Sequence, residues 1–182
     1  MDAGGKGAVF IDRDGVINAI ALRDGKLSVP FRLEDFKILP GVKEAVDILK
    51  NKGFVCVVVT NQPDIQRGNL SPEALSAMHE FMKKETGVDA VYFCPHDKDG
   101  ECDCKKPKTG MIRQAVADLE IDLERSWVVG DRWRDIELGK AAGVKTVLVK
   151  TLATRHDNKE LHPDYGADDF LSATRIIQNI AP

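Results

Sequence analysis

The chain has 182 residues, of which 43% are hydrophobic and 30% are charged, so it can bury a core and global disorder is excluded. A formal net charge of −3 and an aromatic content of 6% argue against a nucleic-acid partner, because neither a basic footprint nor a set of stacking platforms is available. No apolar run approaches the roughly 18 residues of a membrane span, and the first residues lack a signal-peptide pattern. We therefore expect a cytoplasmic protein without membrane partners, and we expect a monomer.

Short runs rich in valine and isoleucine predict strands at residues 8–11, 54–59, 90–93, 127–129 and 146–149. Continuous apolar runs of this length are typical of strands that are buried on both faces of a parallel sheet. Amphipathic stretches between them predict helices near 42–52, after 71–72, over 112–119, between 135 and 143, and over 171–180. This alternation predicts an α/β fold, doubly wound, with a mainly parallel sheet and helices on both faces.

Two long segments interrupt the alternation, residues 19–39 after the first strand and residues 94–110 after the third. Loops of this length in a compact domain are usually functional, and ligands in such folds bind at the carboxyl ends of the strands. We expect a single domain over residues 1–182, with its core at 7–150.

Polar residues follow three of the predicted strands. Asp12 and Asp14, just before Gly15, follow the first strand, and a metal or a shared proton would relieve the repulsion between their carboxylates. Thr60 and Asn61 follow the second strand and could grip a phosphate or an oxyanion. Asp131 and Asp135 follow the fourth strand, four residues apart, which would put them on one face of a helix.

A lysine pair, Lys105 and Lys106, lies in the long segment after the third strand and offers point charges for a phosphate. Each of these patterns taken alone also fits a structural role. The aspartates suit turns and helix N-termini, Thr60 and Asn61 suit a capped turn, and the lysines suit a solvated loop.

Three of the four cysteines lie close together in the same long segment. Cys94 and His96 precede Cys102 and Cys104, and three thiolates with one imidazole form a complete tetrahedral zinc set. Because no ligand position stays open, we expect a structural Zn²⁺ that staples the loop 94–104 and positions the lysine pair. Cys56, inside a predicted strand, is interpreted as a small buried hydrophobe.

In order along the chain, these residues resemble the four motifs of the haloacid dehalogenase superfamily of phosphatases. Asp12–Gly15 is similar to the first motif, Thr60–Gln62 to the second, Lys106–Pro107 to the third, and Gly130–Asp135 to the fourth. The zinc loop and the run Cys102–Pro107 further resemble the D-glycero-D-manno-heptose 1,7-bisphosphate phosphatases and the related histidinol-phosphate phosphatases, which lack a large cap domain.

The resemblance implies a Mg²⁺-dependent hydrolysis of a phosphorylated sugar through an aspartyl phosphate, with the heptose 7-phosphate as the expected substrate and histidinol phosphate as the alternative. It implies Asp12 as nucleophile, Asp14 as general acid and base, and Mg²⁺ held by Asp12, the Asp14 carbonyl and Asp131. To act first as an acid, Asp14 should have a raised pKa. It implies Thr60, Asn61 and Lys106 as ligands of the reacting phosphate, and Arg67 and Lys105 as ligands of a second phosphate. Asp135 is expected either to bind Mg²⁺ through water or to orient Lys106.

Two other classes of protein share part of this pattern. A phosphate-accepting signalling domain would need a carboxylate after the third strand, where this chain has Phe93 and Cys94. A zinc-dependent binding module with incidental acidic residues would not hydrolyse phosphoesters.

Overall fold

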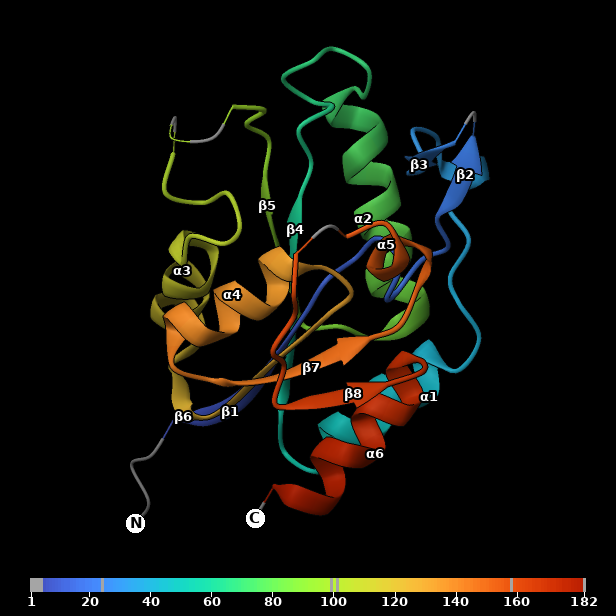
Figure 1. Cartoon of the computed structure of the whole chain (residues 1–182). Coiled ribbons are helices and arrows are strands. Elements are labelled where there is room, and N and C mark those ends of the chain that lie inside the picture. Colours follow the sequence, from blue (N-terminus) through green and yellow to red (C-terminus); the bar gives the residue numbers. More distant parts are fainter. Residues whose placement is uncertain (1–4, 24, 99, 101, 158, 182) are drawn as a thin grey trace.

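The structure, a computed structural model, describes residues 5–23, 25–98, 100, 102–157 and 159–181. Its centre is a six-stranded sheet in the order β5-β4-β1-β6-β7-β8 (Figure 1), and all its pairings are parallel. The strands are β1 (Lys6–Ile11), β4 (Val55–Asn61), β5 (Ala90–Cys94), β6 (Ile121–Gly130), β7 (Lys145–Val149) and β8 (Tyr165–Ala167).

Helices cover both faces of the sheet, as the sequence predicts. One face packs against α1 (Val42–Asn51), α2 (Pro72–Thr86) and α6 (Phe170–Ile180), and the other against α3 (Gly110–Leu119) and α4 (Trp133–Ala142). The sequence signals hold in detail for α2, where the Ser71 side chain accepts a hydrogen bond from the Ala74 N–H and Pro72 occupies the first turn. The doubly wound α/β prediction is therefore confirmed.

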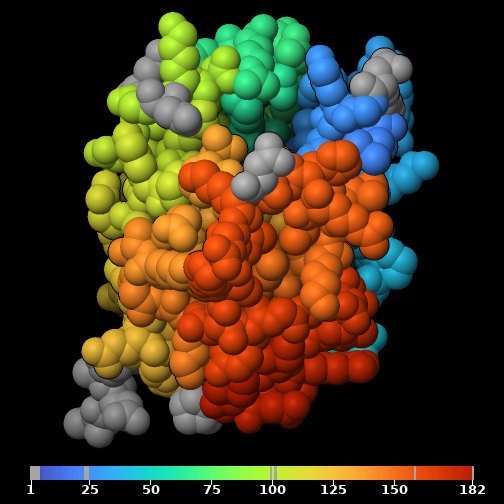
Figure 2. Space-filling model, in the orientation of Figure 1, coloured from blue at the N-terminus to red at the C-terminus, as the bar shows by residue number. Residues whose placement is uncertain are grey.

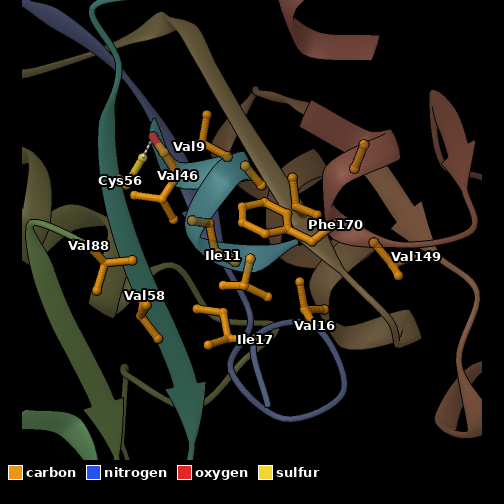
Figure 3. Packing of buried hydrophobic residues seen from close by; sticks show 14 of the residues in the cluster. Val9, Ile11, Val16, Ile17, Val46, Cys56, Val58, Val88, Val149 and Phe170 are labelled. Carbon is orange, nitrogen blue, oxygen red and sulfur yellow. Dashed lines mark hydrogen bonds between the residues drawn. The ribbon is translucent and has the colours of Figure 1, made fainter. Parts of the chain in front are cut away.

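The strands alternate between two hydrophobic clusters. Val9 and Ile11 of β1 face the cluster under α1, α2 and α6 (Figure 3), whereas Ala8 and Phe10 face the cluster under α3 and α4. Cys56 is fully buried in the first cluster with its thiol 4.0 Å from the Val46 carbonyl. Burial raises the pKa of this thiol to about 12, as the interpretation as a small hydrophobe requires.

The short elements escaped prediction. Segment 19–39 contains a hairpin of β2 (Ala21–Arg23) and β3 (Lys26–Ser28) and the 3-10 helix η1 (Leu33–Asp35), and the chain also forms α5 (Leu152–Arg155) and β8. Three- and four-residue elements carry too few apolar positions to show a period. β6 begins six residues before the predicted strand, because its first half is only partly buried and carries charged residues.

The hairpin is small, and the described residues contain no cap domain over the sheet. The hairpin, the loop after β4 and the segment after β5 all rise at one end of the molecule, at the top of Figures 1 and 2. That end is the carboxyl edge of the parallel strands. Among the described helices, none combines the length and the apolarity that crossing a membrane requires.

Candidate active site

A cavity of about 190 Å³ opens at the carboxyl edge of β1, β4 and β6. Six predicted site residues line it, namely Asp12, Asp14, Thr60, Asn61, Lys106 and Asp135. The rest of the wall consists of residues outside the predicted catalytic, phosphate-binding and metal-binding sets, namely Ile20, Leu27, Val29, Pro63, Arg132, Arg134 and Ala153. The hairpin thus contributes apolar residues and the start of α4 contributes two arginines.

Lys106 is the electrostatic centre of the cavity. Its ammonium donates to Asp12 Oδ1 at 2.6 Å, to Asp135 Oδ1 at 2.7 Å and to the Val59 carbonyl at 2.9 Å, and the residue is 4% exposed. Burial acts to lower the pKa of Lys106, but the two carboxylates outweigh it and the pKa is raised. Lys106 is therefore a fixed positive charge beside Asp12.

Three buried carboxylates, those of Asp12, Asp131 and Asp135, lie with one oxygen each within 4.8 Å of the others. Burial first, and then mutual repulsion, raises the pKa of Asp131 to about 8, and burial raises that of Asp12 to about 7 against the opposing charge of Lys106. Asp131 Oδ1 is buried and has no hydrogen-bond partner among the described residues. An all-oxygen set with an orphaned carboxylate oxygen fits a hard divalent cation such as Mg²⁺.

Asp131 and Asp135 converge in a different way from the one predicted. Asp131 precedes the helix at the end of β6, and only Asp135 lies within α4, in its first turn. The expected shared helix face is therefore wrong. Asp135 Oδ2 accepts a hydrogen bond from the Arg132 N–H at 3.1 Å while Oδ1 holds Lys106, so one residue caps the helix and orients the lysine.

Two glycines permit this close packing. Gly15 has a φ of +95°, and a Cβ there would lie 2.1 Å from Asp131 Oδ2. A Cβ on Gly130 would lie 2.2 Å from Asp135 Cβ. Only glycine lets the backbone approach these carboxylates so closely, which explains why glycine follows Asp14 and precedes Asp131.

Asp14 differs from its predicted state. Its carboxylate accepts hydrogen bonds from the Arg13 guanidinium at 3.0–3.2 Å, from Asn18 Nδ2 at 3.0 Å and from Gln62 Nε2 at 2.8 Å. Burial would raise the pKa of Asp14, but Arg13 and these donors lower it overall. The expectation of a raised pKa for Asp14 is wrong, because spacing along the chain does not indicate that Arg13 folds back onto its neighbour.

Thr60 and Asn61 lie at the end of β4, as predicted. The Thr60 hydroxyl accepts a hydrogen bond from Gln62 Nε2 at 2.9 Å. Asn61 binds the main chain of Lys106 twice, because its Oδ1 accepts from the Lys106 N–H at 2.9 Å and its Nδ2 donates to the Lys106 carbonyl at 3.3 Å. Asn61 thus anchors the segment that carries the lysine.

The four predicted zinc ligands, Cys94, His96, Cys102 and Cys104, gather in one cluster. His96 Nδ1 lies 3.5 Å from Cys94 Sγ and 3.4 Å from Cys104 Sγ, and the Cys94 and Cys102 sulfurs are 3.6 Å apart. A tetrahedral zinc site requires ligand atoms about 3.5–3.8 Å apart, given the usual Zn–S and Zn–N bond lengths. The cluster therefore fits Zn²⁺, with Nδ1 as the imidazole ligand.

Arg67 and Lys105 are absent from the described cavity wall. Arg67 forms ion pairs with Asp97 and, at 3.7 Å, with Asp64, while the Lys105 ammonium donates to the Asp97 carbonyl. Asp97 therefore joins the loop after β4 to the zinc loop. The assignment of Arg67 and Lys105 to a second phosphate stays a prediction.

This edge of a doubly wound sheet holds a buried carboxylate paired with a lysine, beside a cluster of carboxylates that fits a cation. Such a fold and site define a phosphatase of the HAD-like class. Residues 103–173 match the family described as HAD-hydrolase-like. The chain is 41% identical over 160 residues to the D-glycero-beta-D-manno-heptose-1,7-bisphosphate 7-phosphatase of Haemophilus ducreyi, covering 81% of this chain and 85% of that protein. It is 35% identical to the enzyme of the same name from Haemophilus influenzae, covering 95% and 97% of the two chains.

Among solved structures, D,D-heptose 1,7-bisphosphate phosphatase from B. bronchiseptica, solved with magnesium and phosphate, superposes with a TM-score of 0.83 at 29% identity. The match covers 96% of this chain and 99% of that one. The chain belongs to the family of D-glycero-D-manno-heptose-1,7-bisphosphate 7-phosphatases, and it is a phosphatase.

Proposed function

We propose that the chain removes the 7-phosphate of D-glycero-D-manno-heptose 1,7-bisphosphate, with the β anomer as the preferred substrate. The observation that carries this proposal is the similarity to relatives of that name along nearly the full chain. The site geometry agrees with it, since a buried carboxylate beside a fixed ammonium suits transfer of a phosphoryl group. In this proposal the chain forms a single domain over residues 1–182 and acts as a cytoplasmic monomer.

In the proposed mechanism, an Asp12 carboxylate oxygen attacks phosphorus in line and the bond to the sugar oxygen breaks. Asp14 donates a proton to the departing alkoxide, and then takes a proton from the water that cleaves the aspartyl phosphate and frees inorganic phosphate. Because Asp14 is held as a carboxylate in this structure, the proposal requires it to gain its proton when the phosphorylated substrate brings negative charge into the cavity.

Lys106, Thr60 and the Asn61 N–H would neutralise and hold the oxygens of the reacting phosphate. Asp12, the Asp14 carbonyl and Asp131 would hold Mg²⁺, with Asp135 contributing through water or through Lys106. When bound, Mg²⁺ supplies positive charge that offsets the charge of the phosphate oxygens. Zn²⁺ on Cys94, His96, Cys102 and Cys104 would be structural, since its ligand set is complete.

Two pairs of cationic residues are candidates for binding the second phosphate. Arg67 and Lys105 are the pair that the family resemblance implies. Arg132 and Arg134 are the pair that lines the cavity. Alanine variants of each pair separate them, because loss of the binding pair raises KM for the bisphosphate and leaves KM for a monophosphate unchanged.

The decisive experiment measures kcat/KM with Mg²⁺ for both anomers of the heptose bisphosphate, for histidinol phosphate and for fructose 1,6-bisphosphate. We expect a preference of about a hundredfold or more, or about 2.7 kcal/mol, for the β-heptose substrate. A preference for histidinol phosphate would replace the substrate and keep the mechanism. Slow hydrolysis of all four at similar rates would overturn the substrate proposal.

A further inference from the structure

His79 of α2 contacts the catalytic region through a residue that the proposed mechanism does not use. Its Nε2 lies 3.2 Å from Nη1 of Arg13, and the two residues are 66 positions apart in the chain. Arg13 in turn binds Asp14, through Nη2 at 3.0 Å to each carboxylate oxygen and through Nε at 3.2 Å. The three residues form a chain of contacts that ends at the predicted general acid.

The direction of the contact between His79 and Arg13 follows from their chemistry. A guanidinium has donors and no acceptor, so Nη1 donates and His79 Nε2 must be an unprotonated acceptor. The imidazole is then neutral, with its proton on Nδ1. Burial, together with the charge of Arg13, lowers the pKa of His79 to about 4, which agrees with a neutral ring.

Arg13 depends on these partners because nothing else can solvate it. It is fully buried, with its guanidinium carbon 5.5 Å from the centre of the Phe36 ring, and its hydrogen bonds in the described part of the chain go to Asp14 and His79. His79 is 8% exposed and packs against the Phe93 ring at 5.7 Å. An apolar residue at position 79 would leave a buried N–H group without a partner, and the guanidinium would shift to find one.

We propose that His79 is a positioning residue for the reaction. Its Nε2 accepts a hydrogen bond from Arg13 Nη1 and so fixes the orientation of the guanidinium, which in turn orients the Asp14 carboxyl group. This inference rests on the proposed role of Asp14 as general acid. His79 does not touch the reacting atoms, so it acts through Asp14, first as proton donor to the departing sugar oxygen and then as base toward the water of the second step.

The first of these roles gives a specific readout in kcat/KM, which covers the reaction only up to the departure of the leaving group. Departure of a sugar alkoxide needs a proton from Asp14, whereas departure of p-nitrophenolate, a weak base, does not. Misplacement of Asp14 therefore slows hydrolysis of the heptose bisphosphate more than hydrolysis of p-nitrophenyl phosphate. A general loss of structure would slow both substrates alike.

Three variants test the proposal. His79→Leu removes the acceptor, and His79→Gln restores an acceptor through its amide oxygen. Met78→Ala opens a cavity at the neighbouring buried position on the same helix and keeps the acceptor at position 79. The ratio of kcat/KM for the sugar phosphate to kcat/KM for p-nitrophenyl phosphate is measured for each at saturating Mg²⁺. We expect this ratio to fall about tenfold in His79→Leu, to recover to within about threefold in His79→Gln, and to stay unchanged in Met78→Ala.

An unchanged ratio in His79→Leu, or a failure of His79→Gln to restore it, would overturn the positioning role while leaving the proposed function intact. A wild-type chain that hydrolyses neither substrate would overturn the proposed function and this inference with it. If His79→Leu does not fold, the glutamine variant and the tautomer of His79 in the wild type decide. Nitrogen NMR that finds a proton on Nε2 rather than Nδ1 at neutral pH would refute the inference, and a bare Nε2 would support it.

Discussion

The most consequential residue-scale feature is a lysine between two buried carboxylates. Lys106 pairs with Asp12 and Asp135, and all three side chains are at most 10% exposed. Removing one partner of a buried ion pair is usually costly because a charge is left uncompensated. Here Asp135 would still pair with Lys106 if Asp12 were neutral. A neutral residue can therefore replace Asp12 without leaving the charge of Lys106 unpaired.

We therefore expect Asp12→Asn to abolish turnover while preserving the fold. The amide cannot form an acyl phosphate, so kcat should fall by at least about a thousandfold. Burial raises the pKa of Asp12 to about 7, which makes its charge unfavourable, so Tm without metal should stay within a few degrees of wild type or rise. Steady-state assays and thermal unfolding check this, with Asp47→Asn, an exposed residue of α1, as control. Activity near wild type would exclude Asp12 as nucleophile.

His79 predicts a pH dependence of stability. Its pKa is lowered from 6.5 to about 4 by burial and by Arg13, so below pH 6.5 the unfolded chain takes up a proton that the folded chain refuses. This residue makes no contribution to the free energy of unfolding above pH 6.5, and it lowers that free energy as pH falls toward 4, by up to about 3 kcal/mol.

Urea unfolding of wild type and His79→Gln at several pH values measures this contribution. Any deficit of the variant at pH 7.5 should shrink, and then reverse or vanish, as pH falls from 6.5 to about 4.5. Parallel curves for the two proteins would show that His79 is not held neutral by the fold.

At the scale of elements, the accuracy of the prediction follows the length of each apolar run. The buried stretch of β4 and the apolar face of α1 are recognisable in the sequence, because all their buried residues except Thr60 are apolar. The hairpin β2–β3 does not, although it brings Leu27 and Val29 to the cavity wall. Arg13, Arg132 and His79 were missed for another reason: their roles depend on the direction in which each side chain points in the folded chain, which spacing along the chain does not encode.

The predicted zinc loop shows the opposite case, because its proposed ligands are close in sequence and their chemistry is specific. We propose that this loop holds the neighbouring segment in place. The loop leads directly into Lys106, whose main chain Asn61 fixes from the other side. A loosened loop should therefore harm both stability and the placement of the lysine.

We expect Cys104→Ser to lower the bound zinc below one ion per chain, to lower Tm by about 5–10 °C and to lower kcat/KM by about tenfold or more. Elemental analysis, thermal unfolding and kinetics measure the three effects. Cys56→Ala is the matched control, since it also removes a buried cysteine but lies outside the cluster. It should keep the full zinc content, and equal zinc loss in both variants would contradict the assignment of the ligands.

At the scale of the whole molecule, the parallel sheet brings residues from distant parts of the chain to one edge. Four site residues lie at this edge although they are far apart in the chain. The ends of β1, β4 and β6 carry Asp12, Asn61 and Asp131, and the segment after β5 carries Lys106. The sequence predicts this edge because parallel strands end on the same side. It does not predict the balance of charge there, which leaves three buried carboxylates around one ammonium.

That imbalance makes the folded state a receptor for a cation, and it predicts that Mg²⁺ stabilises the whole molecule. The unfolded chain does not hold the carboxylates together, so binding adds about 2.7 kcal/mol to the free energy of unfolding at a hundredfold excess over Kd. For a chain of this size, Tm should rise by about 5–10 °C. Asp131→Asn removes a carboxylate whose pKa is already raised to about 8, so it should keep or raise Tm without metal and lose the increment with Mg²⁺. Thermal unfolding across a Mg²⁺ titration measures both effects, with Asp47→Asn as the variant that keeps the full increment. An undiminished increment in Asp131→Asn would mean that the cation binds elsewhere on the molecule.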